Sequence, residues 1–286
     1  MLPYAKMNGI GNSILVVDER GHAPVITGDM ARDLGHGALA FEQMMVLSDA
    51  AGADGARSGF DAAVSIFNSD GSRAGACGNG TRCVAWFMGQ TGSGDAQCLD
   101  IDGTAVLCRR DGPLCFTVDM GMPQLGWRDI PLREPADTLA VDLGAILAET
   151  GLGAPVAVGM GNPHAVFFVP DAAGIDLAAL GPRFERHAMF PDRANISFAE
   201  ILSAERILLR VWERGAGPTL ACGSAACATL VAAARRGLAA RQVGIVLPGG
   251  ELTIAWRPDE HVLMSGPVAL EHRGRLDPAT GETRPW

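Results

Sequence analysis

The chain has 286 residues, of which 48% are hydrophobic and 19% are charged, a composition that is ample for two ordinary hydrophobic cores. Its formal net charge of -9, with no basic cluster larger than a pair of arginines, argues against a nucleic-acid partner. The N-terminus lacks the basic-then-apolar plan of a signal peptide, and no apolar run approaches membrane-spanning length. Seven cysteines without a Cys-x-x-Cys motif fit a reducing compartment. We therefore expect a soluble, cytoplasmic protein with no membrane partner and no metal.

In the first half of the chain, short apolar runs alternate with turn residues. These runs predict strands at residues 14–18, 44–47, 62–67, 98–101, 104–108 and 115–119. Asp-Gly turns at 102 and 111 predict hairpins between the last three of them. A helix is expected over residues 29–39, opening on an acidic cap.

A proline-rich connection begins at residue 121 and marks the expected domain boundary. The two predicted domains are residues 1–122 with 266–286, and residues 123–265. In the second domain, helices are expected at 142–150 and 176–180, and strands at 155–158, 165–169, 196–198, 207–212, 243–247, 252–256 and 262–264.

The most informative stretch lies around Cys222. Residues 223–236 are rich in Ala and Leu and end in two arginines, Gly237 follows as a C-terminal stop, and the residues before Cys222 are rich in Gly and Pro. Cys222 is therefore expected where a loop turns into a helix, so that backbone N–H groups without helical partners face the sulfur. Such a position can lower the pKa of a cysteine from ~8.5 to ~3.5–7.5, which favours a reactive thiolate.

The segment around Cys77 repeats this pattern. A polar, glycine-rich loop is followed by Cys77-Gly78 and by an apolar run with a second cysteine. A Gly-Asn loop precedes each motif, with Asn12 in one half and Asn162 in the other, and the offsets between halves are 150 for the Asn pair and 145 for the Cys pair. The sequence therefore predicts an internal duplication, in which each half wraps a sheet around one buried, apolar helix.

Two thiols at two helix N-termini suit one class of reaction. If the halves pack face to face, a carboxylate held between the helix N-termini lies between two sulfurs. Inversion of a carbon α to a carboxylate needs one group that removes a proton and another that returns one to the opposite face, and a thiolate and a thiol suit these roles. The helix N-termini would stabilise charge that builds on the carboxylate.

The sequence also argues against cofactor chemistry. Pyridoxal phosphate needs a Schiff-base lysine, and the only lysine in the chain is Lys6. No phosphate-binding loop and no convincing dinucleotide fingerprint is present. The sequence therefore predicts racemisation or epimerisation of a small-molecule substrate without a cofactor.

The chain resembles the diaminopimelate epimerase family over nearly its whole length. The matching segments are residues 6–12, 68–72, 77–80, 161–164, 193–196, 213–217 and 222–224. The resemblance implies cofactor-free interconversion of LL- and meso-diaminopimelate, in lysine and peptidoglycan biosynthesis, by a homodimer. It also implies an α/β fold of two pseudo-symmetric domains, each a mostly antiparallel sheet around a central helix, with the active site in the cleft between them.

The resemblance assigns roles to individual residues. Cys77 and Cys222 would be the paired base and acid, exchanging roles with the direction of reaction, and His164 and Glu213 would help to set their protonation. Arg214 would grip the distal carboxylate as a charged fork. The remaining substrate-binding residues implied by the family are Asn12, Gln43, Asn68, Gly78, Asn79, Asn162, Asn195, Gly223 and Ser224, with Glu213 among them as well.

The other cysteines are expected to be structural: Cys83 and Cys227 in helix packing, and Cys98, Cys108 and Cys115 in strands of the core. Several positions depart from the family pattern, and none of them is one of the two thiols. They are Asn8, Ser13-Ile14, residues 40–43, Pro218 and Ala225.

Two alternatives remain beside this reading. One is a relative that racemises another amino acid, such as proline, hydroxyproline or histidine; Asn79 and Arg214 argue for diaminopimelate. The other, from a different functional class, is a thiol redox sensor or metal-binding module that uses the same two cysteines. Exchange of an α-hydrogen would distinguish an enzyme from a sensor.

Overall fold

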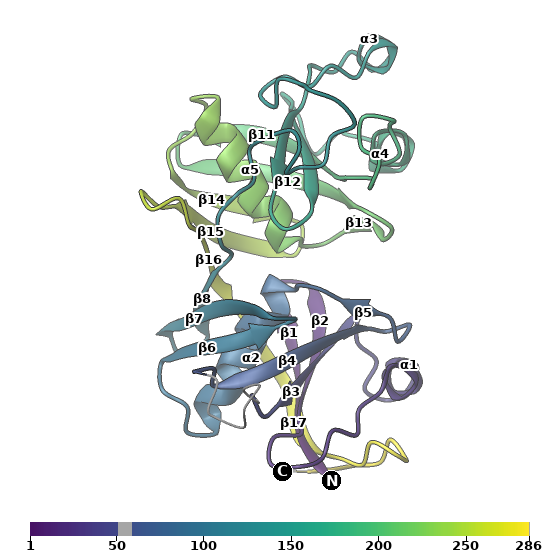
Figure 1. Ribbon diagram of the computed structural model, residues 1–286, viewed down its shortest axis with the longest axis vertical. Coiled ribbons are helices and arrows are strands. Elements are labelled where there is room, and N and C mark those ends of the chain that lie inside the picture. The colour runs from purple at the N-terminus through teal and green to yellow at the C-terminus, as the bar shows by residue number, and fades with distance from the viewer. Residues whose placement is uncertain (51–58, 286) are drawn as a thin grey trace. The chain divides into compact units, whose positions relative to one another are not determined.

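The computed structural model describes residues 1–50 and 59–285, which form two compact units. Unit 1 is Met1–Asp119 with Ser265–Trp286, and unit 2 is Met120–Met264. These bounds compare with 1–122 plus 266–286 and 123–265 expected from the sequence. Each unit is sheet-rich with few helices, which confirms the α/β fold class (Figure 1).

Unit 1 is a chain of paired strands around one long helix. Its elements are β1 (Leu2–Gly9), β2 (Asn12–Asp18), α1 (Gly28–Gly35), β3 (Gln43–Ser48), β4 (Ala62–Asn68), β5 (Arg73–Ala74), α2 (Gly78–Gln90), β6 (Ala96–Ile101), β7 (Thr104–Gly112), β8 (Cys115–Asp119), β17 (Ala269–Leu276) and β18 (Thr283–Pro285). The strands pair in the order β18–β17–β1–β2–β3–β4–β6–β7–β8. Only β2 with β3 and β4 with β6 pair in parallel in this order.

Helix α2 occupies the interior of unit 1. Ten consecutive residues from Asn79 to Met88 are buried, and the helix contacts β1, β2, β3, β7 and β8. A helix that is enclosed on nearly all sides favours small or apolar side chains, as the sequence pattern indicated, although Asn79, Thr81 and Arg82 in its first turns are polar and also buried. Sheet packed around a helix on several sides places the N-terminus of that helix, with Cys77, at the end of the enclosed core.

Unit 2 repeats this plan. Its elements are α3 (Ala145–Thr150), β9 (Val156–Gly159), β10 (Pro163–Phe168), α4 (Leu177–Glu185), β11 (Asn195–Ser203), β12 (Arg206–Glu213), β13 (Gly217–Thr219), α5 (Gly223–Arg235), β14 (Gln242–Leu247) and β15 (Gly250–Trp256); β16 (Val262–Pro267) leads back to unit 1. The strands pair in the order β9–β10–β11–β12–β14–β15, with β10/β11 and β12/β14 parallel. The enclosed helix α5 contacts β9, β10, β11, β14 and β15.

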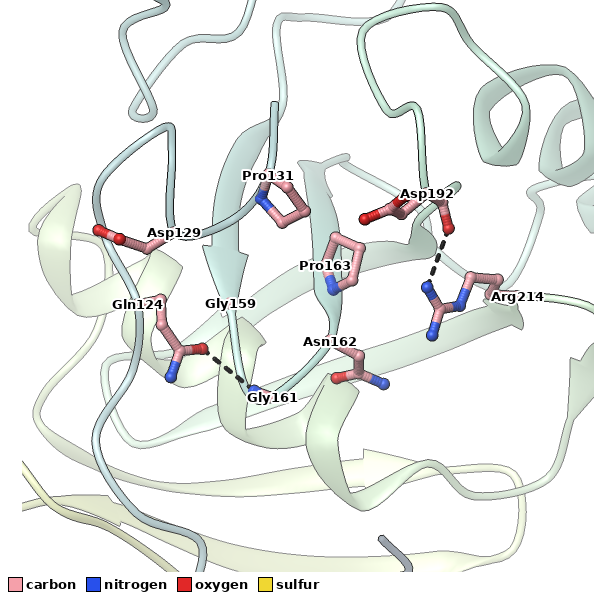
Figure 2. Close-up of a pocket in the computed structure, with 9 residues that line it drawn as sticks. All are labelled: Gln124, Asp129, Pro131, Gly159, Gly161, Asn162, Pro163, Asp192 and Arg214. Atoms are coloured by element: carbon pink, nitrogen blue, oxygen red, sulfur yellow. Dashed lines mark hydrogen bonds between the residues drawn. The ribbon is translucent and has the colours of Figure 1, made fainter. Parts of the chain in front are cut away.

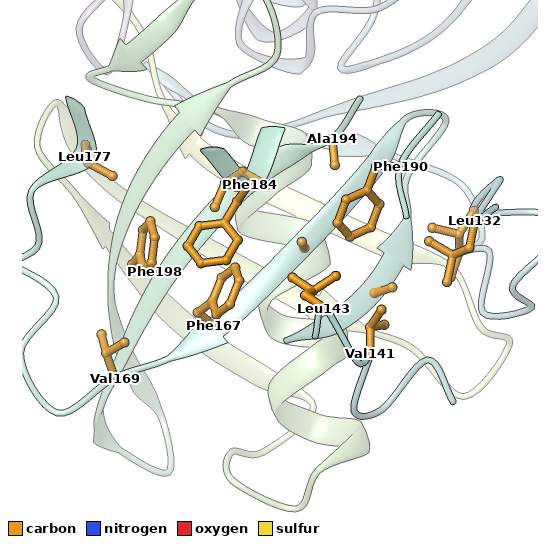
Figure 3. Packing of buried hydrophobic residues seen from close by; sticks show 14 of the residues in the cluster. Leu132, Val141, Leu143, Phe167, Val169, Leu177, Phe184, Phe190, Ala194 and Phe198 are labelled. Atoms are coloured by element: carbon orange, nitrogen blue, oxygen red, sulfur yellow. The ribbon is translucent and has the colours of Figure 1, made fainter. Parts of the chain in front are cut away.

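A second core in unit 2 lies between the sheet and α4. Phe167 of β10 lies with its ring centroid 4.6 Å from that of Phe184 on α4 and 5.3 Å from that of Phe198 on β11 (Figure 3). Alternate residues of β10 and β11 therefore face α4, and the residues between them face α5. Pairs of aromatic rings at these separations add to the burial of apolar area and fix α4 against the sheet.

The duplication extends to individual residue pairs. In unit 1, Gln43 lies opposite Asn68 across β3 and β4, and the Asn68 N–H donates to the Ser72 carbonyl. In unit 2, Ile196 pairs with Trp212, so the next antiparallel step sets Asn195 opposite Glu213, and Glu213 pairs with Gly217. Residues 68, 72 and 77 thus match 213, 217 and 222 with one constant offset of 145. The two units share a topology down to the turn before each key cysteine.

Several element predictions were wrong in detail. The first helix ends at Gly35 rather than at residue 39, and its N-cap is Thr27, not an acidic side chain. The turn predicted at residue 111 lies later, because β7 runs through Gly112, which pairs with Cys115. The turn at 102 is confirmed, with positive φ at both Asp102 and Gly103.

In unit 2, the helix predicted over 142–150 is confined to Ala145–Thr150, after Gly144 with a φ of 65°. The helix expected to end at residue 180 continues to Glu185 through Pro182, capped by Asp176. Strands β1 and β17, which were not predicted, pair with each other.

The predictions for the remaining cysteines were partly wrong. Cys83, Cys108 and Cys227 are buried, and burial raises the pKa of both Cys83 and Cys108 to about 12, as expected for inert thiols in the core. Cys98 and Cys115 are only half-buried: Cys98 lies on the outward face of β6, where buried and partly exposed residues alternate, and Cys115 is the first residue of β8. None of the seven cysteines, all of which lie in the described residues, forms a disulfide.

Candidate functional site

Cys77 caps the N-terminus of α2. Its φ and ψ of −152° and 94° are extended, and its Sγ accepts a hydrogen bond of 3.1 Å from the backbone N–H of Gly80. The Cys77 carbonyl accepts from both the N–H and the hydroxyl of Thr81, each at 2.8 Å. The sulfur therefore replaces the oxygen of an ordinary N-cap side chain and lies in the positive field of the helix N-terminus.

Polar side chains of β3 and β4 form a second feature of unit 1. The Gln43 amide donates to Asn68 Oδ1 at 3.3 Å, and the Asn68 amide donates to the Ser72 hydroxyl at 3.0 Å. Hydrogen bonds from the Ser72 hydroxyl and N–H hold the pKa of Asp70 below its usual range. The turn from Asn68 to Ser72 thus presents an ordered amide beside the strand that leads to Cys77.

Two further amides of unit 1 have an unused hydrogen-bonding atom. Asn12, at the start of β2, and Asn79, in the first turn of α2, each have a buried side-chain oxygen without a hydrogen-bond partner among the described residues. A Cβ on Gly9 would lie 3.2 Å from Asn79, so the β1–β2 turn packs closely on the first turn of α2. Buried acceptors of this kind are available to an ammonium group of a ligand.

Cys222 takes the equivalent position on α5. It precedes Gly223 with extended φ and ψ of −128° and 110°, and its side chain is 6% exposed. Its Sγ lies 3.6 Å from the Ser224 hydroxyl. Burial first, and then the charge of Glu213, raise the pKa of the Cys222 thiol well above its usual value, while the Ser224 hydroxyl and the Ala225 N–H act in the opposite direction.

Glu213 is the last residue of β12 and is ordered by its own turn. Its Oε1 accepts a hydrogen bond of 2.6 Å from the Thr219 hydroxyl on β13, and its carboxylate hydrogen-bonds the Cys222 thiol. A carboxylate that accepts from the thiol favours the protonated sulfur. The structure therefore brings Glu213 and Cys222 together, and burial and charge both favour the thiol form of Cys222.

Asn195, Arg214 and Asn162 lie near one another in unit 2. The Asn195 side-chain oxygen accepts from the Arg214 N–H at 2.9 Å, and the Arg214 guanidinium donates to the Asp192 carbonyl at 2.9 Å. Asn162 and Arg214 line a hollow of about 340 Å³ (Figure 2). The other lining residues are Gln124, Asp129, Pro131, Gly159, Gly161, Pro163 and Asp192. The hollow offers one guanidinium and several amides and carboxylates to a charged ligand.

His164 is fully buried behind this hollow. One ring nitrogen, Nε2, lies 2.7 Å from Asn162 Oδ1, while Nδ1 has no hydrogen-bond partner among the described residues. Burial, and secondarily the charge of Arg214, lower the pKa of His164 to about 3, so the ring is neutral near neutral pH. A neutral ring that donates from Nε2 to the Asn162 oxygen leaves the Asn162 NH₂ group to face a ligand.

The predicted residues thus fall into two half-sites. Unit 1 carries Asn12, Gln43, Asn68, Cys77, Gly78 and Asn79, and unit 2 carries Asn162, His164, Asn195, Glu213, Arg214, Cys222, Gly223 and Ser224. In unit 1, hydrogen bonds join Gln43 to Asn68; in unit 2, they join Asn195 to Arg214 and His164 to Asn162.

Sequence reasoning missed the residues that orient these groups, namely Ser72, Asp192 and Thr219. Ser72 lies in the matching segment 68–72 but was given no role, and Asp192 and Thr219 lie outside every matching segment. Each acts through a turn or carbonyl whose place depends on strand register, which a local pattern does not show.

Within residues 1–50 and 59–285, no helix is long and apolar enough to cross a membrane, and no group of three or more His, Cys, Asp or Glu side chains is arranged to hold a metal ion. Lys6, the single lysine of the sequence, is buried in β1, where it hydrogen-bonds Ser13 and lies 3.7 Å from Glu271.

Known proteins resemble the chain over nearly its whole length. A family model described as diaminopimelate epimerase matches residues 4–125 and 156–271. A diaminopimelate epimerase of Methylocella silvestris is 54% identical over 278 residues, which are 96% of this chain and 94% of the relative. One of Rhodopseudomonas palustris is 49% identical over 280 residues, covering 96% of this chain and 95% of that protein.

Solved structures share the fold at much lower sequence identity. A predicted epimerase of Pseudomonas aeruginosa has a TM-score of 0.69 at 18% identity and covers 96% of this chain and 99% of its own. A probable proline racemase of Agrobacterium radiobacter has a TM-score of 0.66 at 13% identity, with 97% of this chain and 93% of its own covered. At these identities the likeness shows the fold alone.

Proposed function

Because the chain belongs to the diaminopimelate epimerase family, an isomerase family that acts on an amino acid, we propose that it interconverts LL- and meso-diaminopimelate by a two-thiol mechanism without a cofactor. The observation that supports this most directly is the pair of matched half-sites. Cys77 and Cys222 cap equivalent helices, and each is preceded by an equivalent turn, Asn68–Ser72 and Glu213–Gly217. One substrate that contacts both half-sites would have a sulfur on each side of its α-carbon.

In this proposal one cysteine, as the thiolate, takes the α-proton, and the other, as the thiol, gives its proton to the opposite face of the carbon. After one turnover the two sulfurs have exchanged protonation states, so the proton count is conserved and the reverse reaction uses the same groups. The buried Cys222, hydrogen-bonded to Glu213, is suited to be the proton donor at rest. Backbone N–H groups of Gly78, Asn79, Gly223 and Ser224 would stabilise the charge on the reacting carboxylate.

The distal end of the substrate would lie against Arg214. A guanidinium binds a carboxylate through two parallel N–H donors, and Asn162 and Asn195 supply neutral donors and acceptors beside it. A monocarboxylic amino acid such as proline offers nothing to this end of the site. Arg214 therefore favours diaminopimelate over the proline-type alternatives, and the sequence relatives at about half identity favour it as well.

The first test is α-hydrogen exchange. The protein, without added cofactor, is expected to exchange the α-hydrogen of LL-diaminopimelate with solvent deuterium and to form the meso isomer, as followed by NMR. Cys77→Ala and Cys222→Ala should each reduce interconversion by at least about a thousandfold, because each removes one of two obligatory proton carriers. Activity that survives in both variants would contradict the two-thiol mechanism, and turnover of proline instead of diaminopimelate would favour the alternative substrate.

The same family membership supports a homodimer in the cytoplasm that serves lysine and peptidoglycan biosynthesis. Sedimentation equilibrium of the full chain should give the mass of a dimer. The mass of a monomer at micromolar concentration would contradict the homodimer.

A further inference from the structure

The turn that carries Arg214 rests on a buried carboxylate that neither half-site contains. Glu185, the last residue of α4, is 2% exposed. Its Oε2 accepts a hydrogen bond of 2.7 Å from the Trp212 indole N–H, and its Oε1 accepts one of 3.1 Å from the Gly215 backbone N–H. Trp212 and Gly215 are the residues on either side of Glu213 and Arg214.

Glu185 also holds the segment that leads to Asn195. Its Oε1 lies 3.6 Å from the Arg193 guanidinium, and its backbone carbonyl accepts from the Ala194 N–H at 3.2 Å. Arg193 has a φ of 58°, a left-handed backbone conformation that non-glycine residues rarely adopt. One buried side chain therefore contacts both segments whose ends meet where Asn195 accepts from the Arg214 N–H.

The duplicated unit has a counterpart of this contact. Asp70 in unit 1 matches Gly215 under the offset of 145, and the Asp70 carbonyl accepts a hydrogen bond of 3.0 Å from Arg32 on α1. Helix α1 stands in the same place in the element order as α4. In both units a helix side chain thus hydrogen-bonds the backbone of the equivalent turn residue. In unit 1 the side chain is the donor Arg32, and in unit 2 it is the acceptor Glu185.

From this arrangement we infer that Glu185 is a positioning residue for the distal-carboxylate end of the substrate, acting through Arg214 and Asn195. The inference rests on the proposed function for its substrate. Glu213, which contacts Cys222, is held by its own hydrogen bond from Thr219. A change at Glu185 should therefore displace Arg214 more than it displaces Glu213. The expected consequence is weaker substrate binding with the chemical step largely retained.

Glu185→Gln tests the inference with no change in side-chain size. The carboxylate only accepts, and it faces three donors; a glutamine amide must turn two hydrogens of its own toward one of those donors. We expect KM for LL-diaminopimelate to rise about tenfold while kcat falls less than about threefold. Glu149→Gln is the matched control, since it removes an exposed ion pair between Glu149 of α3 and Arg183 of α4, the helix that carries Glu185. It should change neither constant.

A double-variant cycle separates positioning from general destabilisation. If Glu185 acts through Arg214, introducing Glu185→Gln into the Arg214→Ala variant should raise the KM of that variant by less than about twofold. Losses that multiply, or a Glu185→Gln variant with a lower melting temperature and an unchanged KM, would overturn the inference. Should Glu185→Gln fail to fold, Trp212→Phe is the second variant: it keeps an aromatic side chain but removes the indole N–H that donates to Glu185, together with part of the indole volume. It should raise KM severalfold, and an unchanged KM would count against the role.

An activity-independent measurement distinguishes failure of this inference from failure of the proposed function. Hydrogen exchange of the Gly215 amide, followed by NMR, should be at least about tenfold faster in Glu185→Gln than in the parent protein and unchanged in Glu149→Gln. If the parent protein did not turn over diaminopimelate, the proposed function would fail while this readout still reported on the anchor. Equal exchange in all three proteins would overturn the inference whatever the activity.

Discussion

Glu213 is the residue that most directly controls the proton on Cys222. Its charge is the largest specific contribution to the raised pKa after burial, and its carboxylate accepts from the thiol. Because the folded-state pKa lies above the unfolded value near 9, the thiol form contributes to stability below that value, and the contribution is lost as the pH rises through the folded-state pKa. Neutral pH therefore leaves Cys222 as a stable proton donor.

Glu213→Gln should lower the pKa of Cys222, since it removes the negative charge and leaves the burial unchanged. The pH dependence of iodoacetamide labelling at Cys222, resolved from the other cysteines by peptide mass spectrometry, measures this shift. Glu205→Gln serves as the control, because it removes an exposed carboxylate that accepts a hydrogen bond from the Ser203 hydroxyl. An unchanged or higher pKa in Glu213→Gln would show that the carboxylate does not act on this thiol.

At this scale the sequence indicated the chemistry better than the supporting contacts. Cys77 and Cys222 stand out because a cysteine before a glycine and an apolar helix is a local pattern, readable from neighbouring residues. Glu185 could not be singled out, because its three donors come from residues 193, 212 and 215 and meet only when α4 packs beside β12. A surface carboxylate and a buried one look alike in a sequence.

At the scale of elements, α4 and the turn after β12 form one packed assembly. Gly181 in the middle of α4 lies against the Trp212 indole so closely that a Cβ at this position would overlap the ring. The same indole donates to Glu185, one turn further along the helix. Backbone contact through a glycine therefore sets the distance between α4 and β12.

Gly181→Ala should destabilise the protein by about 1–3 kcal/mol, because the rigid indole must move in a packed interior. Helix propensity alone predicts the opposite sign, a gain of about 1 kcal/mol. Gly89→Ala in α2 is the matched control, since a Cβ there meets no atom within 4 Å, and it should stabilise or be neutral. Urea denaturation gives both values, and a stabilised Gly181→Ala variant would refute the packing argument.

Element predictions succeeded where the pattern was strong and local. Helix α5 was predicted over 223–236 and is observed at Gly223–Arg235, because Ala-rich composition and the Gly237 stop act over neighbouring residues. Helix α4 was expected to end at residue 180, and it continues through Pro182 because Phe184 is buried against Phe167 and Phe198. Burial in a core offsets the hydrogen bond that proline cannot make.

At the scale of the whole molecule, one chain supplies both half-sites. The duplication put Cys77 in one unit and Cys222 in the other, and the proposed reaction needs both on a single substrate. We expect that both thiols come from the same chain, since each chain carries a complete set. Oligomerisation would then support the fold without adding residues to the site.

Mixing tests this expectation. Cys77→Ala and Cys222→Ala chains, co-expressed and co-purified through different tags, should interconvert diaminopimelate no faster than either variant alone. Co-expression of the parent chain with Cys222→Ala controls for assembly and should give activity in proportion to the parent chain. Recovery to about half of the parent activity in the mixed dimers, which is one intact site of two, would mean that the two sulfurs come from different chains.

The sequence by itself determined the α/β class, the duplicated plan and the two cysteine-capped helices, because periodicity, glycine stops and repeated motifs are written in neighbouring residues. Only the tertiary structure decided that Asn195 stands opposite Glu213, that β1 and β17 pair, and that Glu185 lies beneath the Arg214 turn. These features depend on strand register and on contacts between residues distant in the chain. Such contacts follow from the packing of the folded chain, which no local pattern encodes.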